Sequence, residues 1–375
     1  MKNHSDVMKT LADARPPQLD PRGTPPFPYA LPDVPSVEHR SRRFRASTLI
    51  PAGALAAVAA AAVGVVAVGP GGPAPAPSLS GPSVEAARPL TTSQMLLTAA
   101  ERSSRDAPGS GRYLVFRTEV GSVRTVGSGA ATYQMTVKSS YEAWLSRSGK
   151  EPNRLTWQDL GMTPLTPADA AAWRAAGSPG KVMVGKPLPT GKLGPGTPVS
   201  ISGGPRTSSS SSGADVYAFG DTNVSVRDLE KLPTDPAALR TALLKRFDGG
   251  GGDMPTDRDQ WLLSVASSLI AGMPVSGPVR AAAFRLLATL PGTRSLGVVT
   301  DQRGRRGEGF AFTSVSPFTG SVDHRFVIDP ETGRALAEES RVLRPSGTTA
   351  TFKPGSLIGY TVVLSQRTTN ETPPN

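Results

Sequence analysis

Cysteine is absent from this 375-residue sequence, and histidine occurs only three times. Without cysteine there is no disulfide framework, no thiolate nucleophile and no zinc–thiolate site. His4 and His39 lie near the start of the chain, so a Ser-His-acid triad would have to use His324. No Gly-x-Ser-x-Gly element accompanies it. We therefore expect His324 to be a structural or solvated residue at the surface or edge of a strand.

Aromatic and aliphatic residues are also scarce. Aromatics make up 6% of the chain and hydrophobic residues 38%, whereas glycine and proline together account for 77 residues (40 and 37). Globular domains are usually richer in apolar residues and poorer in these two turn formers. The composition predicts that several segments are linkers or loops rather than parts of one continuous core.

Motifs for cofactors and catalysis are incomplete. The segment Gly180–Lys186 matches the start of a phosphate-binding loop, but Pro187 stands where serine or threonine is required. Glu338 and Glu339 are adjacent on a predicted strand and so point to opposite faces. Other carboxylates, such as Glu119, Glu142 and Glu308, could meet only through folding. We expect no cofactor, no metal and no enzymatic activity, with a carboxylate-dependent envelope hydrolase as the minor alternative.

One long apolar run is present, from Leu49 to Val68, with twenty residues and no charge. A helix of that length spans about 30 Å, the thickness of the bilayer's hydrocarbon core. Four arginines precede it at Arg40, Arg42, Arg43 and Arg45, and no charge follows before Glu85. This asymmetry predicts a single-pass protein of the cell membrane, with a cytoplasmic N-terminus and an extracellular C-terminal portion. The alternatives are a cleaved signal peptide and a buried alanine-rich helix.

The rest of the chain divides around this span. We predict a disordered cytoplasmic tail over 1–46, the transmembrane helix over 47–69, a Pro/Gly-rich linker over 70–90, an exterior domain over 91–367 and a disordered tail over 368–375. The first segment is proline-rich and too short to bury a core. It is either a topology-setting tail or a docking peptide for a cytoplasmic protein.

The exterior portion has the pattern of an α+β domain with a curved antiparallel sheet and a helical insertion. Residues 92–105 have helical spacing, and alternating strands follow over 113–120, 131–138, 140–146 and 153–160. Capping signals predict a short helix near 167–176 and three further helices, beginning near 236, 257 and 277. Strands close the chain over 294–302, 307–316, 324–328, 335–344 and 357–366. We expect residues 185–198 and the serine run at 207–212 to be exposed loop.

Several segments resemble those of a family of uncharacterised membrane-anchored actinobacterial proteins. They are LPTDPAALRTALL (232–244), PVRAAAFRLLATLPGTRSLGVVTDQRGRRG (278–307) and FVIDPETGRALAEE (326–339). More distantly, the order of helix and strands resembles periplasmic lipoprotein carriers and the sigma-factor regulators that share their fold. That resemblance implies an apolar pocket for acyl chains on a curved sheet. The candidate lining residues are Phe116, Trp144, Phe326, Ile358, Tyr360 and Val362.

Three functions are compatible with these observations. The first is a non-enzymatic, membrane-anchored sensor or carrier for an envelope lipid or lipoprotein. The second is an anti-sigma-like regulator that signals through residues 1–46, and the third is the hydrolase. The net charge of +11 includes a basic cluster at Arg303, Arg305 and Arg306, which is either a solvated hairpin tip or a contact for anionic headgroups. Nucleic acid is not an expected partner, because the domain should face outward.

Overall fold

The computed structural model describes residues 91–106, 109–128, 131–188, 190–211, 217–219, 222–250, 255–316 and 318–374. The predicted tail, membrane span and linker, over 1–46, 47–69 and 70–90, lie outside these residues. Among the helices that are described, none combines the length and the apolar character needed to cross a bilayer.

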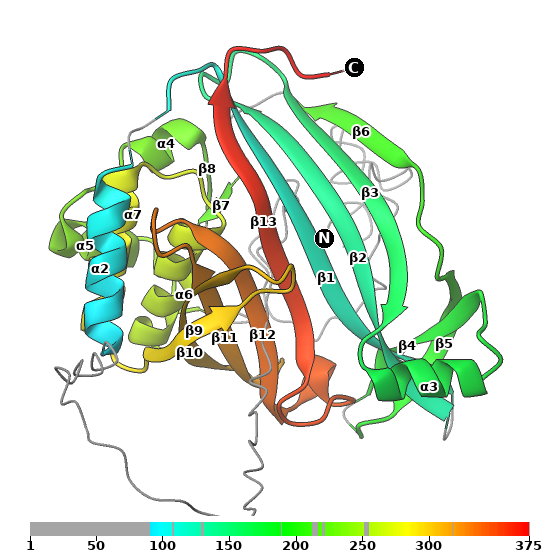
Figure 1. Ribbon diagram of the computed structural model, residues 1–375. Helices are drawn as coiled ribbons and strands as arrows, with labels where there is room; N and C mark the ends of the chain where they lie inside the picture. The colour runs from blue at the N-terminus through cyan, green and yellow to red at the C-terminus, as the bar shows by residue number, and fades with distance from the viewer. Residues whose placement is uncertain are drawn as a thin grey trace, which may run out of the picture. The chain divides into compact units, whose positions relative to one another are not determined.

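A curved, unclosed antiparallel sheet forms the centre of the described structure (Figure 1). Its strands lie in the order β6-β3-β2-β1-β13-β12-β11-β10-β9, with β4 pairing with β1 and β5. The first strands along the chain are β1 (Tyr113–Ser128), β2 (Ala131–Ser146), β3 (Asn153–Pro164), β4 (Lys181–Pro187), β5 (Leu193–Ser200) and β6 (Arg206–Ser211). The closing strands are β9 (Arg294–Thr300), β10 (Arg306–Ser316), β11 (Gly320–Ile328), β12 (Ala335–Pro345) and β13 (Leu357–Thr369). A separate two-stranded ribbon joins β7 (Tyr217–Phe219) to β8 (Thr222–Val224).

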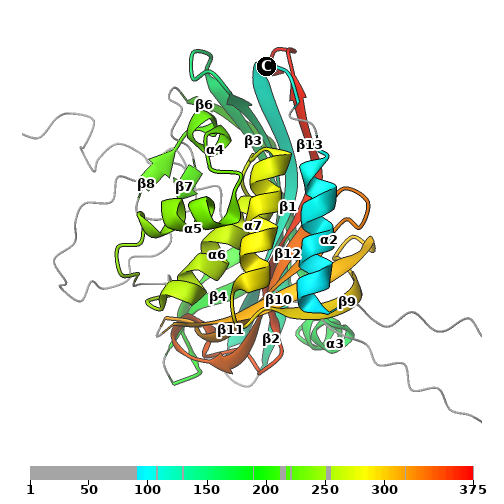
Figure 2. The ribbon, with the colours of Figure 1, turned by 90° about the vertical axis from the view of Figure 1, so that its left-hand side faces the viewer.

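Helices cover one face of this sheet at its β9–β12 side (Figure 2). They are α2 (Thr92–Ser104), α4 (Val226–Glu230), α5 (Pro236–Leu244), α6 (Arg258–Ala271) and α7 (Gly277–Thr289). Between β3 and β4 lies α3 (Pro167–Ala175), and a short turn, η2 (Gly347–Thr349), precedes β13. The segment from α4 to α7 is inserted between β8 and β9, so mixed helix and sheet with a helical insertion is confirmed.

Local capping explains where these helices begin. Asp235 accepts a hydrogen bond from the backbone of Ala238 ahead of Pro236, and Ser276 accepts one from Val279 ahead of Pro278. Both residues thereby satisfy amide groups that a helix start leaves without partners. At the start of α6, Asp257 accepts a hydrogen bond from the backbone of Gln260 in the same way.

Two predicted loops are strands in the structure. The serine run pairs with β3 as the edge strand β6, and residues 181–200 form the β4–β5 hairpin. The predicted strands 131–138 and 140–146 are also one continuous strand, β2. In each case backbone hydrogen bonds to a neighbouring strand compensate for a weak side-chain pattern, which single-sequence periodicity does not detect.

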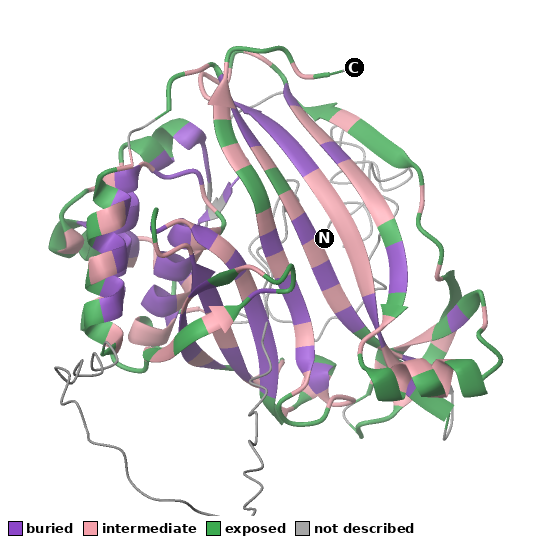
Figure 3. Cartoon of the chain, in the orientation of Figure 1, coloured by how far each residue is buried: buried purple, intermediate pink, exposed green. Residues whose placement is uncertain are grey.

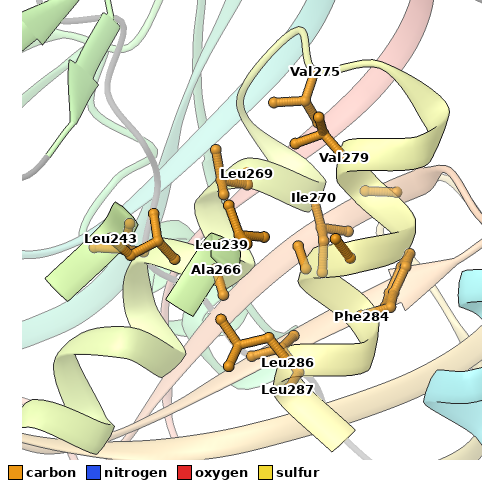
Figure 4. Packing of buried hydrophobic residues seen from close by; sticks show 14 of the residues in the cluster. Leu239, Leu243, Ala266, Leu269, Ile270, Val275, Val279, Phe284, Leu286 and Leu287 are labelled. Carbon is orange, nitrogen blue, oxygen red and sulfur yellow. The ribbon is translucent and has the colours of Figure 1, made fainter. Parts of the chain in front are cut away.

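The main core lies between the helices and the sheet. Side chains of α5, α6 and α7 meet there, as Figure 4 shows for Leu239, Leu269 and Phe284. A smaller core on the opposite face of the sheet contains Val327, Ala337, Tyr360 and Val362. Alternation along each strand therefore sends neighbouring residues into different cores.

Candidate functional site

Strand β1 has a helix-side face and an opposite face along its whole length. Phe116 packs against the helical core, whereas Tyr113 and Val115 form a cluster with Trp144 on the opposite face. The β1–β2 register pairs Phe116 with Ala143, and Ala143 is buried in the same helical core. Register and burial thus assign every second residue of these strands to one face.

On the helix-side face, a band of half-buried residues separates two fully buried regions. At one end lies the helical core, and at the other a cluster containing Val126, Tyr133 and Met135 beside α3 and β4. Figure 3 shows the change along β2, whose middle is drawn pink between purple stretches. We call this region the central band. Its members used below are Phe116, Val120, Val137, Tyr141, Glu338 and Thr361.

Register places these side chains in one row. Val120 of β1 pairs with Thr361 of β13, and Thr361 pairs with Glu338 of β12. On β2, Val120 pairs with Ser139. Tyr141 and Val137 lie two residues to either side of Ser139 and therefore on the same face. The central band therefore runs across four adjacent strands.

Burial shifts the pKa values of three groups on this face. It raises the pKa of Glu338 to about 8, raises that of Tyr141 and lowers that of Arg124. Yet Glu338 and Tyr141 are only half-buried, and Arg124 is exposed. Both observations fit side chains that protein surrounds but that solvent still reaches.

Polar groups in and beside the central band lack partners. The Thr361 hydroxyl is buried without a hydrogen bond. Neither Glu338 nor Arg124 makes a hydrogen bond or ion pair with any residue that the structure describes. Buried or recessed polar groups normally find partners, so these three are available to a ligand. Arg124 was not among the candidates from the sequence, and Glu338 was considered there only as a carboxylate for hydrolysis.

His324 is half-buried inside the sheet rather than at its edge, which corrects the edge position expected from the sequence. It lies within β11, between β10 and β12, and its ring stacks on Phe312 with centroids 5.0 Å apart. Its Nε2 is 2.7 Å from the Ser314 hydroxyl and its Nδ1 is 3.3 Å from that of Ser340. Burial lowers its pKa to about 4, opposed by the charge of Asp323, so the ring is neutral at physiological pH. Because both ring nitrogens are within hydrogen-bond distance of serine hydroxyls, His324 has the contacts of a structural residue.

The six predicted lining residues do not share one surface. Phe116 lies in the central band, and Phe326 is buried in a stack with Phe310 at 4.8 Å between centroids. Trp144, Tyr360 and Val362 lie on the opposite face. Ile358 is half-buried at a β-bulge between β12 and β13. Of the six, only Phe116 belongs to the central band.

Three of the carboxylates considered for hydrolysis, Glu119, Glu142 and Glu308, are engaged in ion pairs. Glu142 pairs with Arg117 at 2.8 Å and with Arg206 at 3.0 Å, and Glu308 pairs with Arg102 at 3.3 Å. Glu119 pairs with Arg303. Glu338 and Glu339 occupy opposite faces, as their adjacency predicted, because Glu339 accepts a bond from Gln302 beside the Tyr360 cluster.

Two of the three arginines in the loop between β9 and β10 make contacts with the sheet, although the side chain of Arg303 is 48% exposed. Arg305 pairs with Asp301 at 2.7 Å and donates to the carbonyls of Val363 and Leu336 at 2.9 and 2.8 Å. Arg303 reaches Glu119 on β1. Arg306 is exposed. The first two arginines therefore fasten the loop to the sheet.

Comparison with protein-family models, curated proteins and solved structures finds no match to this chain. The resemblances to membrane-anchored actinobacterial proteins and to lipoprotein carriers accordingly stay predictions.

Proposed function

We propose that this protein is a non-enzymatic, membrane-anchored sensor or carrier, and that the half-buried central band is the floor of a recess that binds an amphiphile. The observation that carries the proposal is the half-buried central band between two fully buried clusters on one face of a curved sheet. Apolar side chains left partly uncovered in a recess favour an apolar ligand. Phe116, Val120 and Val137 supply that surface.

The polar groups of the recess suit the headgroup of such a ligand. Arg124 offers an unpaired positive charge, which favours an anionic group. Glu338, whose pKa is about 8, is largely protonated at neutral pH and so can donate a hydrogen bond without repelling an anion. The Thr361 hydroxyl, paired in register with Glu338, adds a second donor. A fatty acid or an anionic lipid has this combination of head and chain.

The location belongs to the same proposal. An exterior domain tethered by residues 49–68 would meet amphiphiles of the cell envelope close to where they reside. A regulator acting through residues 1–46 is the alternative, and it depends on a segment outside the described residues.

Photolabelling tests the binding. The full chain, reconstituted in membranes, is irradiated with a diazirine-bearing palmitate, and the labelled peptides are mapped by mass spectrometry. We expect labels on the β1 and β2 peptides that contain Val120 and Tyr141, and competition by unlabelled palmitate.

A matched pair of variants gives the control. Val120→Lys places a charge on the floor of the recess and should strongly reduce labelling there. Val298→Lys changes a side chain that is 63% exposed on β9 and should leave it unchanged. Labelling that is confined to other peptides, or that both variants retain equally, would refute the proposal.

A further inference from the structure

A second cavity lies on the opposite face of the sheet, away from the central band. It has a volume of about 340 Å³ and is enclosed by β1, β2, β3, β13 and the β9–β10 loop. The loop reaches this position because Arg303 bonds Glu119 of β1 and Arg305 bonds backbone carbonyls of β12 and β13. Figure 1 shows the loop crossing in front of β13. This volume is near the lower end for small-molecule sites.

Two glycines flank Lys138 across the sheet. In the sheet register, Lys138 of β2 lies opposite Gly121 of β1 on one side and opposite Gly161 of β3 on the other. The ring of Tyr360 occupies the place of a side chain at Gly121, and the backbone of Ile201 and Gly203 occupies that at Gly161. The directly opposed residues therefore bring no charged side chain to Lys138.

The cavity has an excess of positive charge and of hydrogen-bond donors. Glu119 is the one carboxylate among the described residues that line it, and both of its oxygens are occupied. Oε2 pairs with Arg303, and Oε1 accepts the Tyr360 hydroxyl at 3.1 Å. Lys138 makes no hydrogen bond or ion pair within the described chain. One ammonium group thus remains uncompensated.

Neutral side chains complete the lining. Thr136 and Thr163 are directly opposite each other in the β2–β3 register, next to Lys138. Their hydroxyl groups can donate beside the ammonium group. Pro164, Leu165 and Leu357 supply an apolar wall.

We propose that this cavity binds a small organic anion, whose carboxylate or phosphate group contacts Lys138 and the two threonine hydroxyls. The short apolar body of the ligand packs against Leu165 and Leu357. Charge-assisted hydrogen bonds to an ammonium group provide the main attraction. This site is separate from the amphiphile recess and does not depend on it.

Calorimetric titration of the full chain in a non-ionic detergent tests the assignment, with inorganic phosphate and butyrate as the two probes. We expect saturable binding of at least one of them. Lys138→Met should weaken it by about tenfold or more, since a hydrogen bond to a charged group is lost. Lys138→Arg should restore much of the affinity.

Lys150→Met is the matched control, because Lys150 is exposed in the turn between β2 and β3. It should bind as the unmodified protein does. Binding of phosphate alone would assign a phosphate group, and binding of butyrate a carboxylate with an apolar body; either supports the site. The assignment is overturned if neither probe binds at millimolar concentration, or if Lys138→Met and Lys150→Met bind equally. Circular dichroism of each variant confirms that the fold is retained.

Discussion

Glu338 carries a carboxyl group that the fold surrounds without giving it a described partner. Burial raises its pKa from 4.5 to about 8. The folded state therefore holds this proton more tightly than the unfolded chain does between these two values. By proton linkage, the contribution of Glu338 to stability falls as pH rises through that window and then levels off above about 8.

Replacing this carboxyl group should remove the effect. For Glu338→Gln we expect the free energy of unfolding, relative to the unmodified protein, to increase between about pH 5 and pH 8, by at most about 1.4 kcal/mol per pH unit. Urea unfolding at several pH values measures it. Glu331→Gln, at an exposed turn position, is the control and should show no such trend. Equal pH profiles for both variants would mean that Glu338 titrates as a solvated group.

Gly121 is needed for a close approach rather than for backbone freedom. A Cβ atom there would overlap the ring of Tyr360, which lies across β1 and bonds Glu119. We expect Gly121→Ala to destabilise the protein by about 1–3 kcal/mol, as overpacking does. Gly180→Ala is the comparison, because nothing lies within 4 Å of an added Cβ there. Thermal or urea unfolding distinguishes the two, and an equally small effect at both positions would contradict the packing argument.

At the scale of elements, the β9–β10 loop connects strands of the sheet through its side chains. The sequence shows its arginines only as a basic cluster. In the structure, Arg305 donates to carbonyls of β12 and β13 next to places where the sheet register shifts. The side chain of Asp301, its ion-pair partner, is fully buried. The loop thus fastens strands whose own ladder hydrogen bonds are interrupted.

Arg305→Ala should consequently be costly. It leaves the Asp301 carboxylate without its main counter-charge and two carbonyls without donors, for which we expect a loss of about 2–4 kcal/mol in unfolding free energy. Arg306→Ala, one residue further on and exposed, should change it by less than about 0.5 kcal/mol. Urea denaturation of both variants makes the comparison. Similar midpoints would show that the loop does not stabilise the sheet.

At the scale of the whole molecule, we expect the apolar segment 49–68 to attach the protein to the membrane. We expect the full chain to stay in the membrane pellet after alkaline carbonate extraction, because a retained span of twenty apolar residues is held by the bilayer. Deletion of residues 49–68 should release it into the supernatant.

The intact mass separates the retained span from a cleaved signal peptide. A chain of 38.9 kDa recovered from the membrane supports the span. A shorter chain, beginning after the apolar run and recovered in the supernatant, would contradict it. Reversing the charge at Arg40, Arg42, Arg43 and Arg45 should reduce the fraction of chains with a cytoplasmic N-terminus, measured by protease protection.

The sequence by itself determined the local elements. Residues 92–104, 236–244, 258–271 and 277–289 form the predicted helices, because capping residues and helical spacing act over only a few positions. Alternation in β1, β10 and β13 likewise predicted strands. These effects act over a few residues, so they predict an α+β chain without reference to any tertiary contact.

Tertiary structure alone decided which residues meet. The serine run became β6 because β3 offers it backbone partners, and Trp144 and Tyr360 were separated from Phe116 by the two faces of the sheet. Lys138, Arg124 and Glu338 have no hydrogen-bond or ion-pair partner among the described residues, and this too depends on which distant parts of the chain lie beside them. Pairing register, burial and charge compensation are properties of several strands together, so no pattern within one segment could predict them.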